Sequence, residues 1–353
     1  MGLTDPRFLI ALVLGAFAGT LFSRLGTPLP WMLGPLVCVA ICCLAGYQLR
    51  APVLARRGGH WMIGTALGLY FTPEAAARLG SLLPLVLIAA AYAVCLGLAF
   101  AFALRRWGGA DPATAFFGGA IGGASEMASL GERAGASVAL VSAGHALRIT
   151  LVVSLLPFAY QWLGVSGNDW FTPIELGVNA PGLLRLLALT ALAGWLASRL
   201  RIPNAWVLGP LFAAAAMSMA QWPLSALPTV LVNAGQLLIG VSLGSRFDRA
   251  FFRRGPRYLG VMALTSLAGI CVSALAAAVL SALSGVPLPT MILAMAPGGV
   301  GEMSLTAKLL QLGVPLVALF HVVRYVAVVM AMRPTYALLA RHRGWPPLRS
   351  AGR

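Results

Sequence analysis

Apolar residues along this chain form long, nearly uninterrupted runs instead of the alternating faces typical of soluble helices or strands. A run of about 20 apolar residues is long enough to cross a hydrocarbon core of roughly 30 Å as a helix. Such runs recur from Phe8 to Leu339, and short breaks rich in Gly, Pro and Arg separate them. The pattern predicts an all-helical integral membrane protein, because no long polar stretch remains for a soluble domain.

The apolar runs fall into two sets of six. The first set covers residues 8–23, 31–47, 60–78, 82–104, 112–131 and 137–162. The second set covers residues 182–199, 206–221, 232–246, 258–283, 288–310 and 314–340. We therefore expect four parts, which are a first transmembrane repeat at 1–165, an external linker at 166–181, a second repeat at 182–341 and a cytoplasmic tail at 342–353.

Three motifs occur twice, once in each set, at separations of 175 or 176 residues. They are Trp31–Leu36 with Trp206–Leu211, Ile63–Gly68 with Ile239–Gly244, and Gly122–Met127 with Gly298–Met303. From Gly122 to Arg148, 9 of 27 positions are identical to their partners, and the identities include a Glu, a His and an Arg. Apolar bias alone does not place three such residues in one register, so we interpret the chain as a duplicated unit.

The basic residues indicate how the helices are oriented. The chain has 25 Lys and Arg, 9 Asp and Glu and a formal net charge of +16. Lys and Arg accumulate on the cytoplasmic side of membrane proteins. If each Gly-rich segment enters and leaves on the same side, most arginines face the cytoplasm, whereas Asp169 and Glu175 face outward. If every segment crossed the membrane instead, Asp169 and Glu175 would face the cytoplasm, and the charges from that loop onward would no longer fit the rule.

Under this arrangement each repeat crosses the membrane five times, and an odd number of crossings inverts the second repeat. The predicted fold is an all-α membrane protein with two inverted repeats of five transmembrane helices. Each repeat also contains a broken or re-entrant Gly-rich segment. The predicted location is the bacterial inner membrane, with multiple crossings and both termini in the cytoplasm.

The two Gly-rich segments, 112–131 and 288–310, contain the main candidates for a binding site. Gly and Pro interrupt a helix, and the freed backbone groups need a cavity or protein partners because lipid offers none. Broken helices at matching places in two repeats are typical of binding sites in secondary transporters. The candidate residues are Gly122, Gly123, Ser125, Glu126, Gly298, Gly299, Glu302 and Ser304.

Ionisable side chains inside a bilayer cost about 2.5–3.5 kcal/mol each on insertion scales and usually serve a function. Glu126 and Glu302 are therefore expected to bind a proton or a sodium ion, the alternative being carboxylates that are paired only to stabilise the fold. The half-helix that begins beside each glutamate offers free N–H groups and partial positive charge to an anion.

A His and an Arg stand three residues apart in each repeat, His145 with Arg148 and His321 with Arg324, so each pair lies on one helix face. The guanidinium groups suit a carboxylate, so they either bind an anionic substrate or neutralise the glutamates as buried ion pairs. The histidines either relay protons or donate one hydrogen bond to a backbone carbonyl. The sequence leaves both alternatives open.

The paired GPL and GG-x-x-EM motifs with the downstream H-x-x-R resemble the AbrB membrane-protein family, and the resemblance covers roughly residues 7–340. That family is similar at fold level to the cation–proton antiporter and anion transporter superfamily. The resemblance implies inverted five-helix repeats whose broken helices cross near the middle of the membrane. Related antiporters often carry paired aspartates at the ion site, whereas glutamates stand at the matching positions here.

We expect a secondary transporter of a small, anionic organic solute, coupled to protons or sodium. One alternative is a cation/proton antiporter without an organic substrate, and another is a membrane protein that regulates gene expression indirectly. The chain lacks the sequence motifs of hydrolases, metalloproteases and phosphate-binding loops, so we expect no enzyme, no cofactor and no metal site. The expected partners are the solute, the coupling ion and the lipid bilayer, with no nucleic acid and with a homodimer left open.

Overall fold

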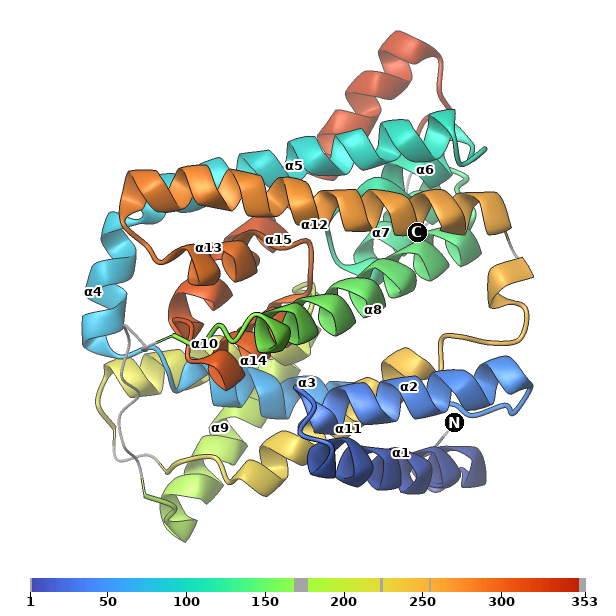
Figure 1. Ribbon diagram of the computed structural model, residues 1–353. Helices are drawn as coiled ribbons and strands as arrows, with labels where there is room; N and C mark the ends of the chain where they lie inside the picture. The colour runs from blue at the N-terminus through green and yellow to red at the C-terminus, as the bar shows by residue number, and fades with distance from the viewer. Residues whose placement is uncertain (1, 168–176, 223–224, 254, 349–353) are drawn as a thin grey trace. The chain divides into compact units, whose positions relative to one another are not determined.

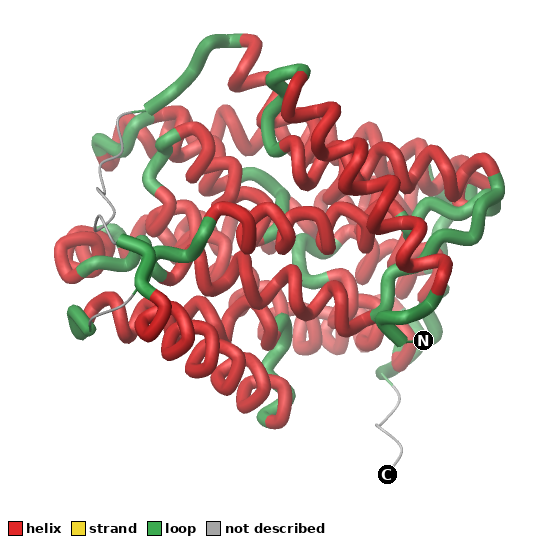
Figure 2. Tube along the Cα trace, turned by 90° about the horizontal axis from the view of Figure 1, so that it is seen from below, coloured by secondary structure: helices red, strands yellow, loops and turns green. Residues whose placement is uncertain are grey.

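The computed structural model describes residues 2–167, 177–222, 225–253 and 255–348, and all structural statements below concern these residues. The expected external acidic residues Asp169 and Glu175 lie outside them. So do parts of the expected linker and tail. The described residues form helices and connecting loops without a strand, as Figure 2 shows.

The first repeat contributes eight helices (Figure 1). They are α1 (Pro6–Arg24), α2 (Pro30–Ala45), α3 (Val53–Gly68), α4 (Pro73–Ser81), α5 (Leu83–Arg106), α6 (Pro112–Gly119), α7 (Ala124–Arg133) and α8 (Val138–Trp162). The second repeat contributes α9 (Ala180–Arg199), α10 (Ala205–Met219), α11 (Thr229–Gly244), the 3₁₀ turn η1 (Phe251–Arg253), α12 (Pro256–Ser284), α13 (Leu288–Met295), α14 (Val300–Leu310) and α15 (Val314–Arg343).

Six of the described helices are long and apolar enough to cross a membrane, namely α1, α5, α8, α9, α12 and α15. They form three pairs related by the repeat, because α1 corresponds to α9, α5 to α12 and α8 to α15. The apolar helices α2, α10 and α11 have 15 or 16 residues, or about 24 Å at 1.5 Å per residue. The structure thus has the helices of a multi-pass membrane protein, whereas ten crossings and inverted repeats stay predictions.

One predicted helix is wrong in its extent. The sequence predicted a single segment over residues 60–78, but α3 starts at Val53 and ends at Gly68, and α4 follows. Helix α4 starts at Pro73. Proline has no backbone N–H group, so α3 cannot continue through this residue. The side chain of Thr72 caps α4, because its Oγ1 accepts a hydrogen bond from Ala75 N at 3.1 Å.

The chain forms two compact units, and each takes helices from both repeats. The first unit comprises Met1–Ser81, Ser154–Ala250 and Val300–Ala318, and is called the scaffold unit here. The second comprises Leu82–Val153, Phe251–Gly299 and Leu319–Arg353, and is called the break unit because both Gly-rich breaks begin in it. Each unit is described by itself below.

In the scaffold unit each repeat packs its helices against helices of the other repeat. Helix α3 lies on α10, and α11 lies on α2 (Figure 1). A Cβ at Gly64 of α3 would come within 2.5 Å of Val207 O on α10, and a Cβ at Gly240 of α11 would collide with Met32 O on α2. The two contacts are equivalent under the repeat. This reciprocity is typical of two units related by a two-fold axis.

In the break unit α5 and α12 lie side by side, and the hydroxyls of Tyr92 and Ser273 are 3.1 Å apart between them. The first half-helix of each Gly-rich segment packs on one of these helices, α6 on α5 and α13 on α12. The approach of α6 is close, because a Cβ at Gly119 would collide with the backbone of Ala101. A buried apolar cluster that includes Phe117, Met127 and Tyr336 joins α6, α7 and α15.

Candidate functional site

The first Gly-rich segment is a broken helix. Asp111 caps α6 by accepting a hydrogen bond from Thr114 N at 2.9 Å, and Pro112 occupies the first helical position. The helix ends at Gly119, and the chain is extended at Ala120, where φ is −55° and ψ is 134°. Helix α7 begins at Ala124. The break therefore leaves the last carbonyl groups of α6 without partners inside their own helix.

His145 and Arg148 of α8 supply those partners. Nε2 of His145 donates to Phe117 O at 2.9 Å, and Nη1 of Arg148 donates to Ala120 O at 3.1 Å and Gly119 O at 3.4 Å. Nη2 of Arg148 also lies 3.0 Å from Nδ1 of His145. Since a guanidinium group only donates, Nδ1 must accept, and the histidine is neutral with its proton on Nε2. Both side chains are fully buried.

The second Gly-rich segment is broken at the equivalent place, but its turn differs. Helix α13 ends at Met295, and Gly298 N donates to Ala296 O at 2.8 Å, which makes a tight turn around Pro297. Nε2 of His321 donates to Leu293 O at 2.9 Å. Arg324 donates from Nη1 to Ala296 O and from Nη2 to Gly298 O, so it holds the carbonyls on both sides of the proline.

The arginines thus do something that the sequence did not predict: they bind backbone carbonyls at the ends of half-helices. No ion pair joins Arg148 or Arg324 to Glu126 or Glu302 among the described residues. The carboxyl end of a helix carries partial negative charge, so it stabilises a cation in that position.

Several polar atoms around the breaks are buried without a hydrogen-bond partner among the described residues. They include Nε of Arg148, Nε of Arg324, Nδ1 of His321 and the hydroxyl of Tyr325. A buried donor or acceptor left unpaired costs about 1–3 kcal/mol, and such groups in a native structure call for an explanation. The break unit therefore has donors and acceptors that a ligand could pair with, close to the buried charges of Arg148 and Arg324.

Glu126 stands at the third position of α7, the position from which a Glu often reaches back to the start of its helix. Ser125 Oγ donates to the carboxylate at 3.1 and 3.2 Å. The carboxylate folds over Gly123, where a Cβ would collide with it and would come within 2.8 Å of Cε2 of Tyr325. Glu126 is partly exposed, as are Gly122 and Gly123.

Glu302 has the same place in α14, which belongs to the scaffold unit. It is the third residue of the helix and is partly exposed. Thr306 Oγ1 donates to its backbone carbonyl at 2.9 Å. Ser304 is fully buried and its Oγ has no hydrogen-bond partner among the described residues. Each broken helix thus has an acidic residue at the positive start of its second half and an arginine at the negative end of its first half.

The structure therefore gathers most of the predicted site residues in the break unit, namely Gly122, Gly123, Ser125, Glu126, His145, Arg148, Gly298, Gly299, His321 and Arg324. Glu302 and Ser304 belong to the scaffold unit.

The prediction missed two tyrosines, Tyr325 beside Glu126 and Tyr258. The hydroxyl of Tyr258 lies between Gly118 and Gly144, at each of which a Cβ would come too close to it. The sequence held a signal for Tyr325, because it follows the paired Arg324 whereas Ile149 follows Arg148. A polar residue that replaces an apolar one beside a duplicated motif marks a difference between the two breaks.

No group of three or more His, Cys, Asp or Glu side chains in the described part of the chain is placed to hold a metal ion. All five cysteines are free. The described side chains at the breaks offer groups for proton binding, hydrogen bonding and electrostatic attraction.

Long apolar helices, interlocked repeats and broken helices with charged ends define a helical, multi-pass membrane protein. The chain belongs to the AbrB family, whose model, described as "Transition state regulatory protein AbrB", matches residues 31–340. It is similar to the protein YhjN of Bacillus subtilis (strain 168), with 27% identity over 94% of this chain and 93% of YhjN. It is also similar to "Putative regulator AbrB" of Escherichia coli (strain K12), with 25% identity over 81% of this chain and 83% of that protein.

Proposed function

We propose that this protein is a secondary transporter of a small, anionic organic solute in the bacterial inner membrane, coupled to protons or sodium. The observation that carries the proposal is the pair of helix breaks at repeat-equivalent positions, each with a partly exposed glutamate at the start of its second half-helix. Breaks of this kind supply backbone groups for binding in membrane transporters. The two repeats are inverted in this proposal, with both termini in the cytoplasm.

The positive charge of the break unit favours an anion. Arg148 and Arg324 are buried, and no carboxylate forms an ion pair with either in the described structure. Their Nη atoms donate to backbone carbonyls and, in Arg148, to His145, so the guanidinium groups act on a solute through their field and through their unpaired Nε atoms. A field of one sign in a low-dielectric site concentrates ligands of the opposite charge.

Glu126 provides the coupling in this proposal. Its carboxylate lies at the start of α7, where free N–H groups and the helix dipole attract any anion. An anionic solute and the ionised carboxylate therefore compete for one place. Protonation of Glu126, or sodium bound to it, removes the competing charge and allows the solute to enter. Glu302 has the corresponding role at α14.

The experiment is uptake into proteoliposomes under an imposed pH or sodium gradient, with a panel of small carboxylates. Uptake is expected with the wild type and at least tenfold less with Glu126→Gln or Glu302→Gln. Glu132→Gln is the matched control, because Glu132 lies on the same helix as Glu126 but is exposed at its far end. Equal uptake by all four proteins would contradict the proposal.

The name of the Escherichia coli relative favours a second candidate, a membrane sensor that regulates gene expression indirectly. A sensor would bind a solute at the breaks without moving it. The same proteoliposomes distinguish the two, since a sensor gives saturable binding and no uptake. Dissipation of the ion gradient without any solute would instead identify a cation/proton antiporter.

A further inference from the structure

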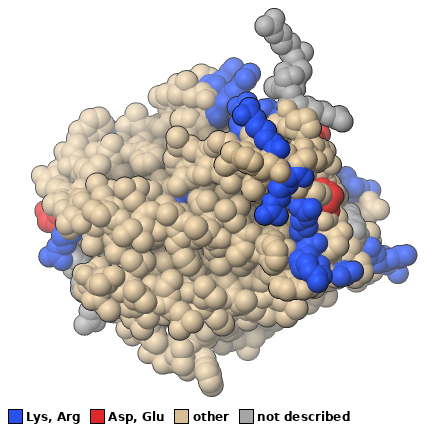
Figure 3. All heavy atoms as spheres, turned by 90° about the horizontal axis from the view of Figure 1, so that it is seen from above, with Lys and Arg blue, Asp and Glu red and all other residues tan. Residues whose placement is uncertain are grey.

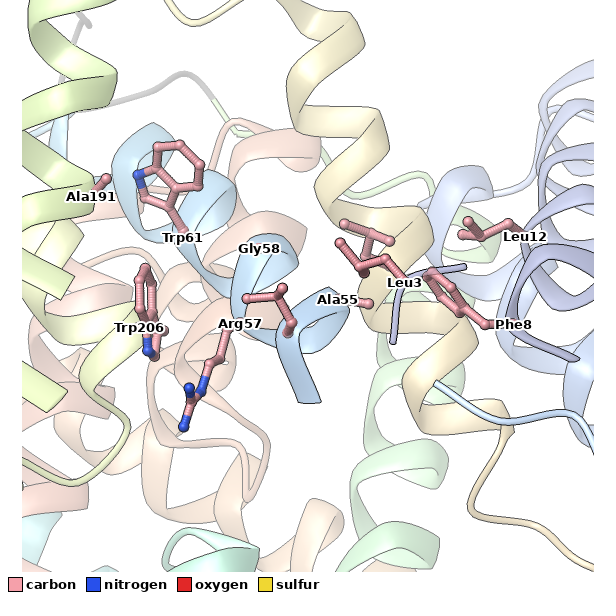
Figure 4. A pocket seen from close by; sticks show the side chains of 11 residues that line it. Leu3, Phe8, Leu12, Ala55, Arg57, Gly58, Trp61, Ala191 and Trp206 are labelled. Atoms are coloured by element: carbon pink, nitrogen blue, oxygen red, sulfur yellow. The ribbon is translucent and has the colours of Figure 1, made fainter. Parts of the chain in front are cut away.

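A groove in the scaffold unit is lined almost wholly by apolar side chains (Figure 4). Its volume is ≈ 560 Å³, within the range of roughly 300–1,000 Å³ found for small-molecule sites. Phe8 and Leu12 of α1, Leu54 and Trp61 of α3 and Leu238 of α11 contribute apolar walls. Helices α9 and α10 complete the lining. The groove is separate from the residues of the helix breaks described above.

Two indole rings are held in fixed positions along this groove. Nε1 of Trp61 donates to Thr190 Oγ1 at 3.0 Å, and Thr190 Oγ1 donates to Leu186 O at 2.7 Å. Trp206 packs against Gly194, where a Cβ would come within 3.0 Å of its Cε3. The hydrogen bond of Trp61 and the packing of Trp206 restrict both rings, which lowers the side-chain entropy lost on binding.

Arg57 is the one charged residue among the side chains that line the groove. It is exposed, and no ion pair to it occurs among the described residues. Figure 4 shows its guanidinium group directed away from Leu3, Phe8 and Leu12, so the polar and apolar parts of the lining are separated. A positive head beside a long apolar surface is complementary to a molecule with a hydrocarbon chain and an anionic group.

The second repeat lacks the corresponding charge. The position equivalent to Arg57 is Asn233, and the position equivalent to Trp61 is Leu237. The duplicated packing of the scaffold unit therefore does not require either side chain. Figure 3 shows that uncharged residues make up most of one face of the molecule, with the Lys and Arg side chains gathered in a few places. Arg57 is thus a feature of the first repeat alone.

We infer that this groove binds a membrane phospholipid with an anionic headgroup. One acyl chain lies along the apolar walls, and Arg57 donates hydrogen bonds to the headgroup phosphate. Each buried CH₂ of an acyl chain contributes about 0.8 kcal/mol, while a basic residue near a headgroup determines which lipid is preferred. A phospholipid without net charge packs against the apolar walls equally well, but its headgroup attracts Arg57 less strongly.

Native mass spectrometry of the purified full chain in detergent tests this inference, with phosphatidylglycerol, phosphatidylcholine and inorganic phosphate as separate probes. Phosphatidylglycerol is expected to bind more tightly than phosphatidylcholine. Arg57→Asn, which introduces the residue of the second repeat, is expected to lower the affinity for phosphatidylglycerol about fivefold, the effect of one basic residue at a headgroup. Arg57→Lys retains most of the preference because it keeps the charge.

Two further variants separate the groove from the general positive charge of the protein. Ala191→Phe fills the lined space and is expected to displace both lipids. Arg106→Asn removes an exposed arginine at the end of α5 and is expected to leave binding unchanged. Equal affinity for the two lipids, unchanged phosphatidylglycerol binding in Arg57→Asn, or binding of inorganic phosphate as tight as that of phosphatidylglycerol would each overturn the inference.

Discussion

The two repeats make equivalent contacts in the scaffold unit but different ones at the helix breaks. In the scaffold unit Gly64 approaches Val207 and Gly240 approaches Met32, and these are the same contact made twice. At the breaks the same His and Arg pair occurs in both repeats, yet the hydrogen bonds differ. The duplication is thus retained in the packing of the scaffold unit, whereas the hydrogen bonds at the two breaks differ.

The difference at the breaks follows from one residue. Pro297 stands where the first repeat has Ile121, and the turn around it brings Gly298 O to Arg324. Arg148 has no such carbonyl beyond the break and donates to His145 instead. His145 therefore uses both ring nitrogens, whereas Nδ1 of His321 has no hydrogen-bond partner in the described part of the chain. In the proposed transporter this asymmetry lets two similar half-sites take different roles, one with Tyr325 beside its glutamate.

The largest effect is expected from overfilling the symmetric contacts. Gly64→Leu and Gly240→Leu each force a side chain against the backbone of a neighbouring helix, which costs about 3 kcal/mol or more. The two variants should lose similar unfolding free energy, measured by thermal or denaturant unfolding in micelles. Gly80→Leu is the control, because no atom lies within 4 Å of a Cβ there. A loss in only one of the pair would contradict the reciprocal packing.

The next effect concerns the arginines at the breaks. Arg324→Met leaves two buried carbonyls without a donor, at about 1–3 kcal/mol each, so we expect a loss of about 3 kcal/mol. Arg148→Met should cost about 2 kcal/mol, because its two carbonyl contacts are longer and belong to adjacent residues. Unfolding of both variants in the same detergent checks the order. The reverse order would show that the turn around Pro297 does not depend on Arg324.

A smaller effect is expected when the second break is made to resemble the first. Pro297→Ile frees the φ angle that the ring fixes, so the turn that presents Gly298 O is less populated. The expected loss is about 1 kcal/mol. If Arg324→Met is combined with Pro297→Ile, the two losses of unfolding free energy should not add, because both substitutions remove the same hydrogen bond, from Arg324 to Gly298 O. Additive losses in this double-mutant cycle would separate the proline from the arginine.

The smallest effect on stability is expected beside the glutamates. Gly123→Ala places a methyl group where the flexible carboxylate of Glu126 now lies and 2.8 Å from Cε2 of Tyr325, so both side chains shift at a cost of at most about 1 kcal/mol. In the proposed transporter the half-saturating coupling-ion concentration should change several-fold. Gly301→Ala is the control beside Glu302, where a Cβ meets only Ile63 Cγ2 at 3.5 Å. It should leave uptake near the wild-type level.

Much of the architecture was predictable because it depends on local pattern. Apolar runs of spanning length marked the six long helices, and the shared register of Glu126, His145 and Arg148 with their partners revealed the duplication. Gly and Pro at matching places predicted both breaks. The extent of α3 was not predictable, since apolar residues continue through the Thr72–Pro73 cap that starts a new helix.

The sequence by itself determined that the chain is a duplicated, helical membrane protein with an interrupted segment in each half. Only the tertiary structure decided that the arginines bind carbonyls of the half-helices, that α3 packs on α10, and that Arg57 borders an apolar groove. The reason is physical. Helix length and breaks depend on neighbouring residues, whereas the partner of a buried cation depends on which acceptor the packing brings within about 3 Å. Arg148 and Ala120 O meet only after the chain has folded.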